Sequence, residues 1–131
     1  MKLAPKNTPF RLTLGQRGEM AAWRFLIREG YKILDKNYQC KLGEIDVVAE
    51  QGGRIRFIEI KTRTSNRFGS PEEAVHPIKQ KKLSQLASFY LKGNQKTDSP
   101  VSFDVVAVYW NAGAEPEIKI IQDAFLHEED I

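Results

Sequence analysis

Two adjacent glycines, Gly52 and Gly53, separate two segments in which apolar residues alternate with polar ones, as is typical of β-strands. The first segment covers residues 43–50 and the second covers residues 54–63. Glycine accepts the positive φ values that tight hairpin turns require, so this dipeptide predicts a two-residue turn. We therefore expect an antiparallel hairpin at the centre of the fold, with Gln51 facing Arg54.

This register determines which side chains face each other across the hairpin. It places Asp46 opposite Glu59 and Glu44 opposite Lys61. Because strand residues two apart share a face, these four side chains are expected on one face of the sheet. The other face should carry the apolar residues that form part of the core: Ile45, Val47, Ile58 and Ile60.

Two carboxylates that face each other on paired strands repel and destabilise the sheet. Lys61 can compensate part of this charge, and a divalent cation such as Mg²⁺ would compensate more, because hard cations take carboxylate oxygens as ligands. The alternative is a solvent-exposed face on which the charges are simply hydrated. Val48 and Phe57 share this face with the acids and argue against a fully exposed surface.

A third carboxylate belongs to the first helix. Thr13 and Gln16 have the spacing of a capping box, and a helix over about residues 14–29 should end at Gly30. One side of this helix carries three arginines: Arg17, Arg24 and Arg28. Glu19 lies nearly opposite them, at the edge of the apolar stripe, where it either reaches water or needs a charged partner or a metal.

The rest of the chain completes a mixed α/β pattern. We expect a strand within residues 31–38, a helix over residues 77–92, a strand over residues 103–110 and a short strand over residues 117–121. The order is αβββαβ followed by one more strand, with a central mixed sheet flanked by helices. Residues 1–12 are expected to be a flexible basic arm, residues 13–126 a single domain, and residues 127–131 an acidic tail.

Composition excludes several classes of protein. A single cysteine, Cys40, rules out an intrachain disulfide and a cysteine-based zinc site, and it fits a reducing cytoplasm. No apolar run approaches the length of a membrane span. The net charge of +3 and the basic cluster at residues 79–82 are compatible with a nucleic-acid partner, although charge alone favours a hydrated helix face as the explanation of the lysines.

Seven segments then follow in an order that resembles a known family: GQRGEMAAWRFL, GYKIL, GEIDVVA, FIEIKTR, FGSPEEAV, KQKKL and FDVVAV. They resemble the YraN family of bacterial proteins over about residues 13–126. That family has a restriction-endonuclease-like fold and is related to the archaeal Holliday-junction resolvases. Ser102, where the family commonly has arginine, and Gln39, where a basic residue is expected, depart from its pattern.

The resemblance implies a metal-dependent nuclease core of the PD-(D/E)xK kind. Asp46 and Glu59 would bind Mg²⁺ or Mn²⁺, with the carbonyl of Ile60 as a further ligand. Glu19 would complete this site, and Lys61 would orient the attacking water or stabilise negative charge. The implied reaction is hydrolysis of DNA phosphodiesters, with branched DNA such as a Holliday junction as a candidate substrate, and analogy with the resolvases implies a homodimer.

Further residues are expected to have supporting roles. Five basic residues are candidates for contacts with nucleic-acid phosphates: Arg63, Arg67, Lys79, Lys81 and Lys82. Three polar residues are secondary candidates: Glu44, Gln80 and Asp104. Two other classes of function stay open, namely a nucleic-acid-binding protein that keeps the fold without catalysis and a protein–protein adaptor.

Overall fold

The structure is a computed structural model that describes residues 11–64, 75–110 and 115–126. Most of the expected basic arm, the segment that contains Arg67, and the expected acidic tail lie outside the described residues.

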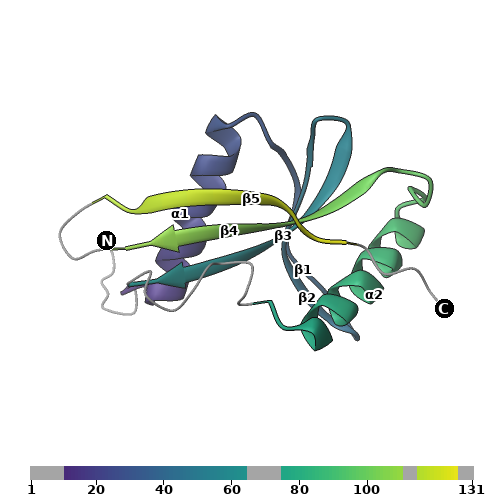
Figure 1. The fold of residues 1–131 in the computed structure, drawn as a ribbon, viewed down its shortest axis with the longest axis horizontal. Coiled ribbons are helices and arrows are strands. Elements are labelled where there is room, and N and C mark those ends of the chain that lie inside the picture. The colour runs from purple at the N-terminus through teal and green to yellow at the C-terminus, as the bar shows by residue number, and fades with distance from the viewer. Residues whose placement is uncertain (1–10, 65–74, 111–114, 127–131) are drawn as a thin grey trace, which may run out of the picture.

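The described residues form two helices and five strands in the order α1, β1, β2, β3, α2, β4, β5 (Figure 1). Their bounds are α1 Leu14–Arg28, β1 Lys32–Cys40, β2 Gly43–Gln51, β3 Arg54–Arg63, α2 Pro77–Gly93, β4 Val101–Tyr109 and β5 Glu117–Phe125. The predicted α/β class and element order are confirmed. The last strand is longer than expected, because its pairing with β4 continues as far as Phe125.

Local signals set the starts of both helices. The Thr13 hydroxyl accepts a hydrogen bond from the Gln16 amide at 3.0 Å, and the Gln16 side chain accepts one from the Thr13 amide at 2.9 Å. This reciprocal capping box satisfies two backbone N–H groups that the helix itself leaves unpaired. At the start of α2, Nδ1 of His76 accepts a hydrogen bond from the Ile78 amide at 3.1 Å.

All five strands belong to one sheet in the order β1-β2-β3-β4-β5. Only β3 and β4 are parallel neighbours, and α2 lies between them in the chain. The predicted hairpin register between β2 and β3 is confirmed from Gln51 and Arg54 at the turn to Val47 and Ile58. Gly52 and Gly53 both have positive φ values, 63° and 75°, as the predicted tight turn requires.

The two helices cover opposite faces of the sheet. Alternate residues of β2, β3 and β4 pack with α1 in one buried cluster, the α1-side cluster, which includes Ala22, Leu26, Val47, Ile58 and Val106. The intervening residues pack with α2 in a second buried cluster, the α2-side cluster, which includes Val48, Phe57, Leu86, Tyr90 and Phe103. Because β4 is covered on both faces, its sequence is nearly continuous in apolar residues.

One prediction about the hairpin faces is wrong. Val47 packs on the α1 side as Ile58 does, but Ile45 belongs to the α2-side cluster. Two residues of one strand share a face only while the strand stays regular, so the faces of β2 exchange at Asp46.

The side chains of the neighbouring strand β1 also exchange faces of the sheet at this level. Lys36 pairs with Val47 and its ammonium lies 4.4 Å from the centre of the Trp23 ring of α1. Tyr38 pairs with Ile45 and its ring meets that of Tyr90 of α2 edge-on at 5.1 Å. Asn37 between them has a φ of 56°, a left-handed conformation that turns the strand over.

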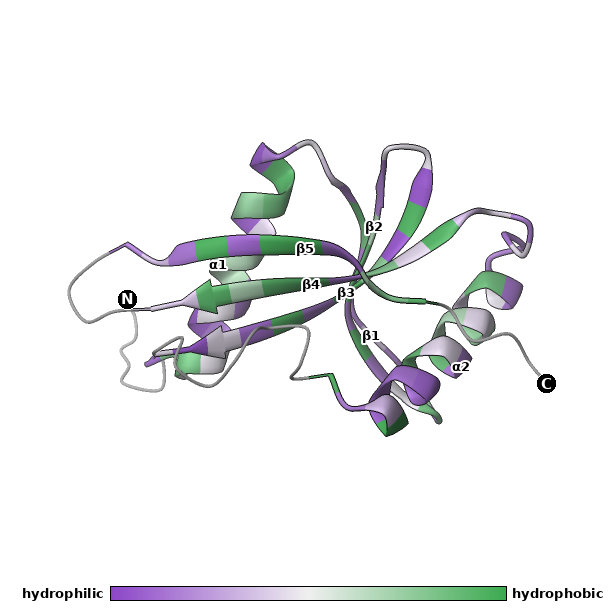
Figure 2. Ribbon diagram, viewed as in Figure 1, coloured by the Kyte–Doolittle hydropathy of each residue, from purple (hydrophilic) through white to green (hydrophobic). Residues whose placement is uncertain are grey.

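Strand β5 forms one edge of the sheet, and Figure 2 shows polar and apolar residues alternating along it. This alternation fits an edge strand with one covered face. No helix in the described ranges is long and apolar enough to span a membrane.

Candidate functional site

The hairpin opens at Asp46. In an unbroken ladder of this register, the Ile60 amide would donate to the carbonyl of Ile45. Instead it donates to Oδ2 of Asp46 at 2.8 Å. The carboxylate thus replaces a backbone acceptor between β2 and β3, and this contact fixes its position at the place where the faces of β2 exchange.

Glu59 lies on the face of β3 that α2 covers, and only 7% of its surface is exposed. Its Oε2 forms an ion pair with Lys79 near the start of α2, and Nζ of Lys61 lies 3.5 Å from the same oxygen. Two ammonium groups therefore compensate this buried carboxylate, as a buried charge requires. The sequence predicts that Lys61 compensates part of the acidic charge, but it indicates only phosphate contacts for Lys79, which lies 20 positions along the chain from Glu59.

Glu19 approaches from the opposite side of the sheet because it belongs to α1. The helix packs closely here: a Cβ atom on Gly18 would lie 1.9 Å from Oγ1 of Thr62 in β3. Burial, and next the negative charge of Glu44, raise the pKa of Glu19. Glu19 therefore lies in an acidic environment.

Asp46 is the most perturbed of these acids. Its pKa is raised from 3.8 to about 6, first by burial and then by the charge of Glu59, with a smaller contribution from Glu19. The hydrogen bond from Ile60 and the charge of Lys79 act in the opposite direction. We call the three carboxylates of Glu19, Asp46 and Glu59, with the ammonium groups of Lys61 and Lys79, the acid cluster.

The chemistry of the acid cluster fits a divalent cation. Three carboxylates outnumber two ammonium groups. Burial first, and then the charge of Glu59, raise the pKa of Asp46, and a bound cation would offset both effects. Among the described residues, however, no three Asp, Glu, His or Cys side chains lie close enough together to form a ligand set. The physical reason is that Glu19 and Glu59 are carried on opposite sides of the sheet, with Asp46 between them.

The residues predicted to contact phosphates are dispersed. Lys81 and Lys82 are exposed on α2, whereas Arg63 is half-buried and its guanidinium donates to the Thr62 carbonyl at 3.0 Å. Lys79 is engaged by Glu59, so it would have to leave that carboxylate to reach a phosphate. These contacts, like the one assigned to Arg67, stay predictions.

The secondary candidates have varied surroundings. Gln80 donates a hydrogen bond to the Val75 carbonyl at 2.9 Å, which fits a role in fixing the start of α2. Glu44 is exposed at the start of β2. Its negative charge contributes to the raised pKa of Glu19. Among the described residues, Glu44 and Lys61 do not form the predicted ion pair.

Asp104 belongs to a buried network that sequence reasoning missed. Its carboxylate is 1% exposed, and its Oδ2 pairs with Nη1 of Arg56 at 3.2 Å. The Ser102 hydroxyl donates to Oδ1 of Asp104 at 2.6 Å and accepts from Arg56 at 2.8 Å. Ser102 thus contributes to the interior of the fold, and the guanidinium that lies beside it comes from β3.

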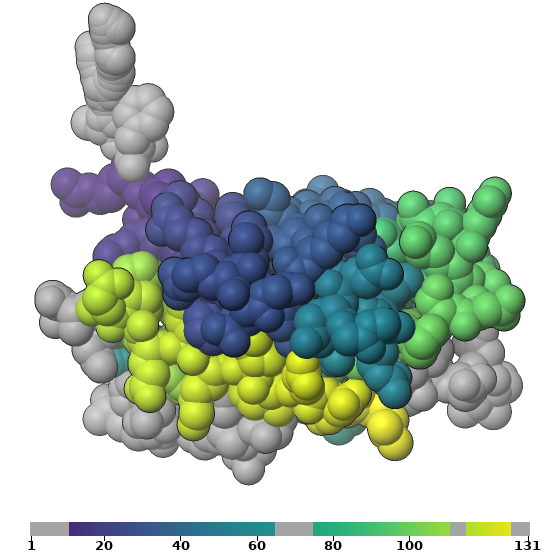
Figure 3. All heavy atoms as spheres, turned by 90° about the horizontal axis from the view of Figure 1, so that it is seen from above, coloured from purple at the N-terminus to yellow at the C-terminus, as the bar shows by residue number. Residues whose placement is uncertain are grey.

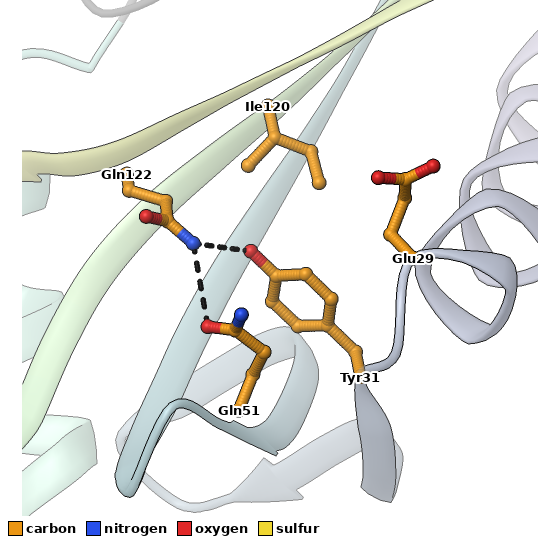
Figure 4. A pocket seen from close by; sticks show the side chains of 5 residues that line it. All are labelled: Glu29, Tyr31, Gln51, Ile120 and Gln122. Carbon is orange, nitrogen blue, oxygen red and sulfur yellow. Dashed lines mark hydrogen bonds between the residues drawn. The ribbon is translucent and has the colours of Figure 1, made fainter.

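Two hollows are lined by described residues, and neither includes a member of the acid cluster. Figure 4 shows one of about 330 Å³, in which Gln122 donates hydrogen bonds to the Tyr31 hydroxyl at 2.7 Å and to the Gln51 side chain at 3.4 Å. The other, of about 450 Å³, lies between α1 and the start of β5 and is lined by three arginines.

The fold and the acid cluster together define a small mixed α/β protein with carboxylates gathered at the opening of a central hairpin. The model of the family described as "Uncharacterised protein family UPF0102" matches residues 18–108, and the chain belongs to this family. A UPF0102 protein of Moorella thermoacetica is 44% identical over 90% of this chain and 99% of its own length. Another, from Caldicellulosiruptor saccharolyticus, is 42% identical over 86% of this chain and 96% of its own.

Proposed function

We propose that this protein is a metal-dependent nuclease that hydrolyses phosphodiester bonds of DNA. The observation that carries the proposal is the position of Asp46, whose half-buried carboxylate is held between two strands beside Glu59 and has a pKa raised to about 6. A chain that only had to fold would gain stability by losing this charge. Its presence is more readily explained by a ligand of opposite charge.

The members of the acid cluster would bind the metal, position water or stabilise charge. Asp46 and Glu59 would hold Mg²⁺ or Mn²⁺, with the Ile60 carbonyl as a third oxygen and Glu19 at the border of the site. The bound metal would supply Lewis-acid activation of water and neutralise charge on the phosphate. Lys61 would position the attacking water and stabilise the negative charge that develops on the phosphate oxygens. Lys79 would have to release Glu59 when a cation binds.

The resemblance to the resolvases supports the choice of substrate. The order αβββαβ and the mixed sheet are compatible with a restriction-endonuclease-like core. By this analogy we propose branched DNA, such as a four-way junction, as the substrate and a homodimer as the active form, since a two-fold substrate suits a two-fold enzyme.

The test is cleavage of labelled four-way junctions, flaps, duplexes and single strands in Mg²⁺ or Mn²⁺. We expect cleavage by the native protein and its loss in both Asp46→Asn and Glu59→Gln, with binding of the substrate retained. Glu50→Gln is the matched control, because Glu50 is an exposed carboxylate on the same strand as Asp46. Equal cleavage by Asp46→Asn and the native protein would refute the proposal.

One observation favours a second function, that of a nucleic-acid-binding protein without catalysis. The ion pair between Lys79 and Glu59 places a protein cation where a metal would otherwise neutralise this carboxylate. This function predicts salt-sensitive binding to DNA with no cleavage in any metal. A protein that binds no nucleic acid at low salt would instead be studied as a protein–protein adaptor.

A further inference from the structure

A basic groove lies outside the acid cluster, on the other side of α1. It encloses about 450 Å³ between the helix and the start of β5, and its main polar residues are Arg17, Arg24, Arg28 and Glu115, with Trp110 on the wall. Figure 3 shows α1 and the first residues of β5 at the same end of the molecule. We call this hollow the arginine groove.

The three arginines are spaced so that they face one way. They occupy positions i, i+7 and i+11 of α1, which brings them to one side of a helix with 3.6 residues per turn. At a rise of 1.5 Å per residue the row spans about 16 Å. A row of three positive charges of this length suits the regularly spaced negative charges of a nucleic-acid backbone.

The charge in the arginine groove is largely uncompensated. In the described ranges none of these three arginines forms an ion pair with a carboxylate. Against their three positive charges the groove has one acid, Glu115. Instead of meeting a carboxylate, the guanidinium of Arg17 lies 4.6 Å from the centre of the Trp110 ring. This contact holds the guanidinium in place and leaves its charge available, because an aromatic ring does not neutralise it.

The arginine groove is connected to the strand that carries the acid cluster. The Trp110 amide donates a hydrogen bond to the carbonyl of Arg63 at 2.8 Å, and Arg63 is the last residue of β3. On α1, Arg17 is only two residues from Glu19, although the two side chains face opposite sides of the helix. The arginine groove and the acid cluster thus share α1 and are linked through the end of β3.

We propose that the arginine groove binds the sugar–phosphate backbone of a nucleic acid. Guanidinium groups suit this partner because their planar donor pairs match phosphate oxygens. The arginine groove is a different surface from the phosphate contacts predicted on α2 and around the end of β3. The choice of nucleic acid as the polyanion rests on the proposed function. Binding to the groove requires no metal, so it can be measured without cleavage.

The test compares two variants of equal charge in a fluorescence anisotropy assay with labelled duplex and single-stranded DNA in EDTA. The groove variant is Arg17→Gln, Arg24→Gln, Arg28→Gln. The control variant is Lys32→Gln, Lys92→Gln, Lys96→Gln, which removes three exposed positive charges elsewhere. A third variant with lysine at the three arginine positions keeps the charge, and circular dichroism checks that each variant folds.

Each lost phosphate contact reduces the slope of log affinity against log salt by about 0.9 for duplex DNA, so the groove variant should lose about 2 to 3 from the slope. The same relation predicts a loss of at least tenfold in affinity near 0.1 M salt. The lysine variant should keep most of the slope, and the control variant should lose less than 1.

Three results would overturn the inference. If the native protein binds DNA and the groove variant matches the control variant, the groove is not the contact surface, while the proposed nuclease stands. If polyglutamate of equal length competes as well as DNA and depends equally on the arginines, the partner is an acidic protein. If the native protein does not bind DNA at all, the proposed function fails together with this inference.

Discussion

Replacing Asp46 with asparagine should make the protein more stable at neutral pH. Asparagine has the same shape, and its side-chain oxygen can still accept the hydrogen bond from the Ile60 amide, which measures 2.8 Å in the native protein. The substitution removes only the negative charge. This charge is unfavourable in the fold, because burial and the neighbouring carboxylates raise the pKa of Asp46 to about 6.

The size of the effect follows from that pKa. An aspartate with a pKa of 3.8 in the unfolded chain and about 6 in the folded protein favours folding in its protonated form. This contribution is fully present below about pH 3.8 and is lost as the pH rises through about 6. At 1.36 kcal/mol per pKa unit, the ionisation of Asp46 lowers the free energy of unfolding of the native protein by up to about 3 kcal/mol at pH 8.

Asp46 is partly exposed, so solvent screening reduces this figure, and we expect Asp46→Asn to raise the free energy of unfolding by about 2 kcal/mol at pH 8. For a domain of this size that corresponds to a Tm higher by roughly 6 °C. Thermal denaturation of both proteins between pH 4 and pH 8, in EDTA, measures the difference, with Glu50→Gln as the control. By pH 4 the difference in Tm between the two proteins should fall to a small fraction of its value at pH 8. A variant no more stable than the native protein at pH 8 would refute the assigned electrostatics.

Three other predictions concern the packing around the acid cluster and the interior. Gly18→Ala should lower the free energy of unfolding by about 1 to 3 kcal/mol, because the new methyl group would meet Thr62, and Thr62→Ala in the same chain should restore part of this loss in urea denaturation. Arg56→Met should lower the free energy of unfolding by about 3 to 5 kcal/mol in the same assay, because it leaves the buried Asp104 carboxylate without its cation. Replacing both Arg56 and Asp104 with apolar residues should lower it less. Lys79→Met should increase the rise in Tm that Mn²⁺ produces, because it removes the protein cation that competes for the acid cluster, and an unchanged rise would contradict this competition.

Features that depend on neighbouring residues could be predicted from the sequence. The turn at Gly52 and Gly53, the hairpin register and the capping box at Thr13 are each determined by a few residues close together in the chain. The turn also predicted that Asp46 lies near Glu59, and the charge of Glu59 does act on Asp46. The predicted direct pairing of these two residues lies beyond the regular ladder, which ends at Val47 and Ile58.

Contacts between distant segments were not accessible in this way. Lys79 reaches Glu59 only because the crossover between β3 and β4 brings the start of α2 over that face, and no local pattern records this. The face exchange at Asp46 was missed because it occurs together with a left-handed residue, Asn37, in the neighbouring strand, and the alternation within β2 does not show it.

The buried pair of Arg56 and Asp104 did leave a signal that could have been used. Arg56 alternates with Ile58 and Ile60 on one strand, and Asp104 alternates with Val106 and Val108 on another. A single charge on each of two otherwise apolar faces indicates that the two side chains pair in the interior.

The hydrogen bond from Ile60 to Asp46 has a consequence for how this sequence can diverge. A descendant that no longer needs the negative charge gains stability by losing it, but an apolar side chain at position 46 would leave the partly buried Ile60 amide without this acceptor. Asparagine is the replacement that removes the charge and keeps the acceptor. We therefore expect natural variants that lack the proposed nuclease activity to carry asparagine at position 46.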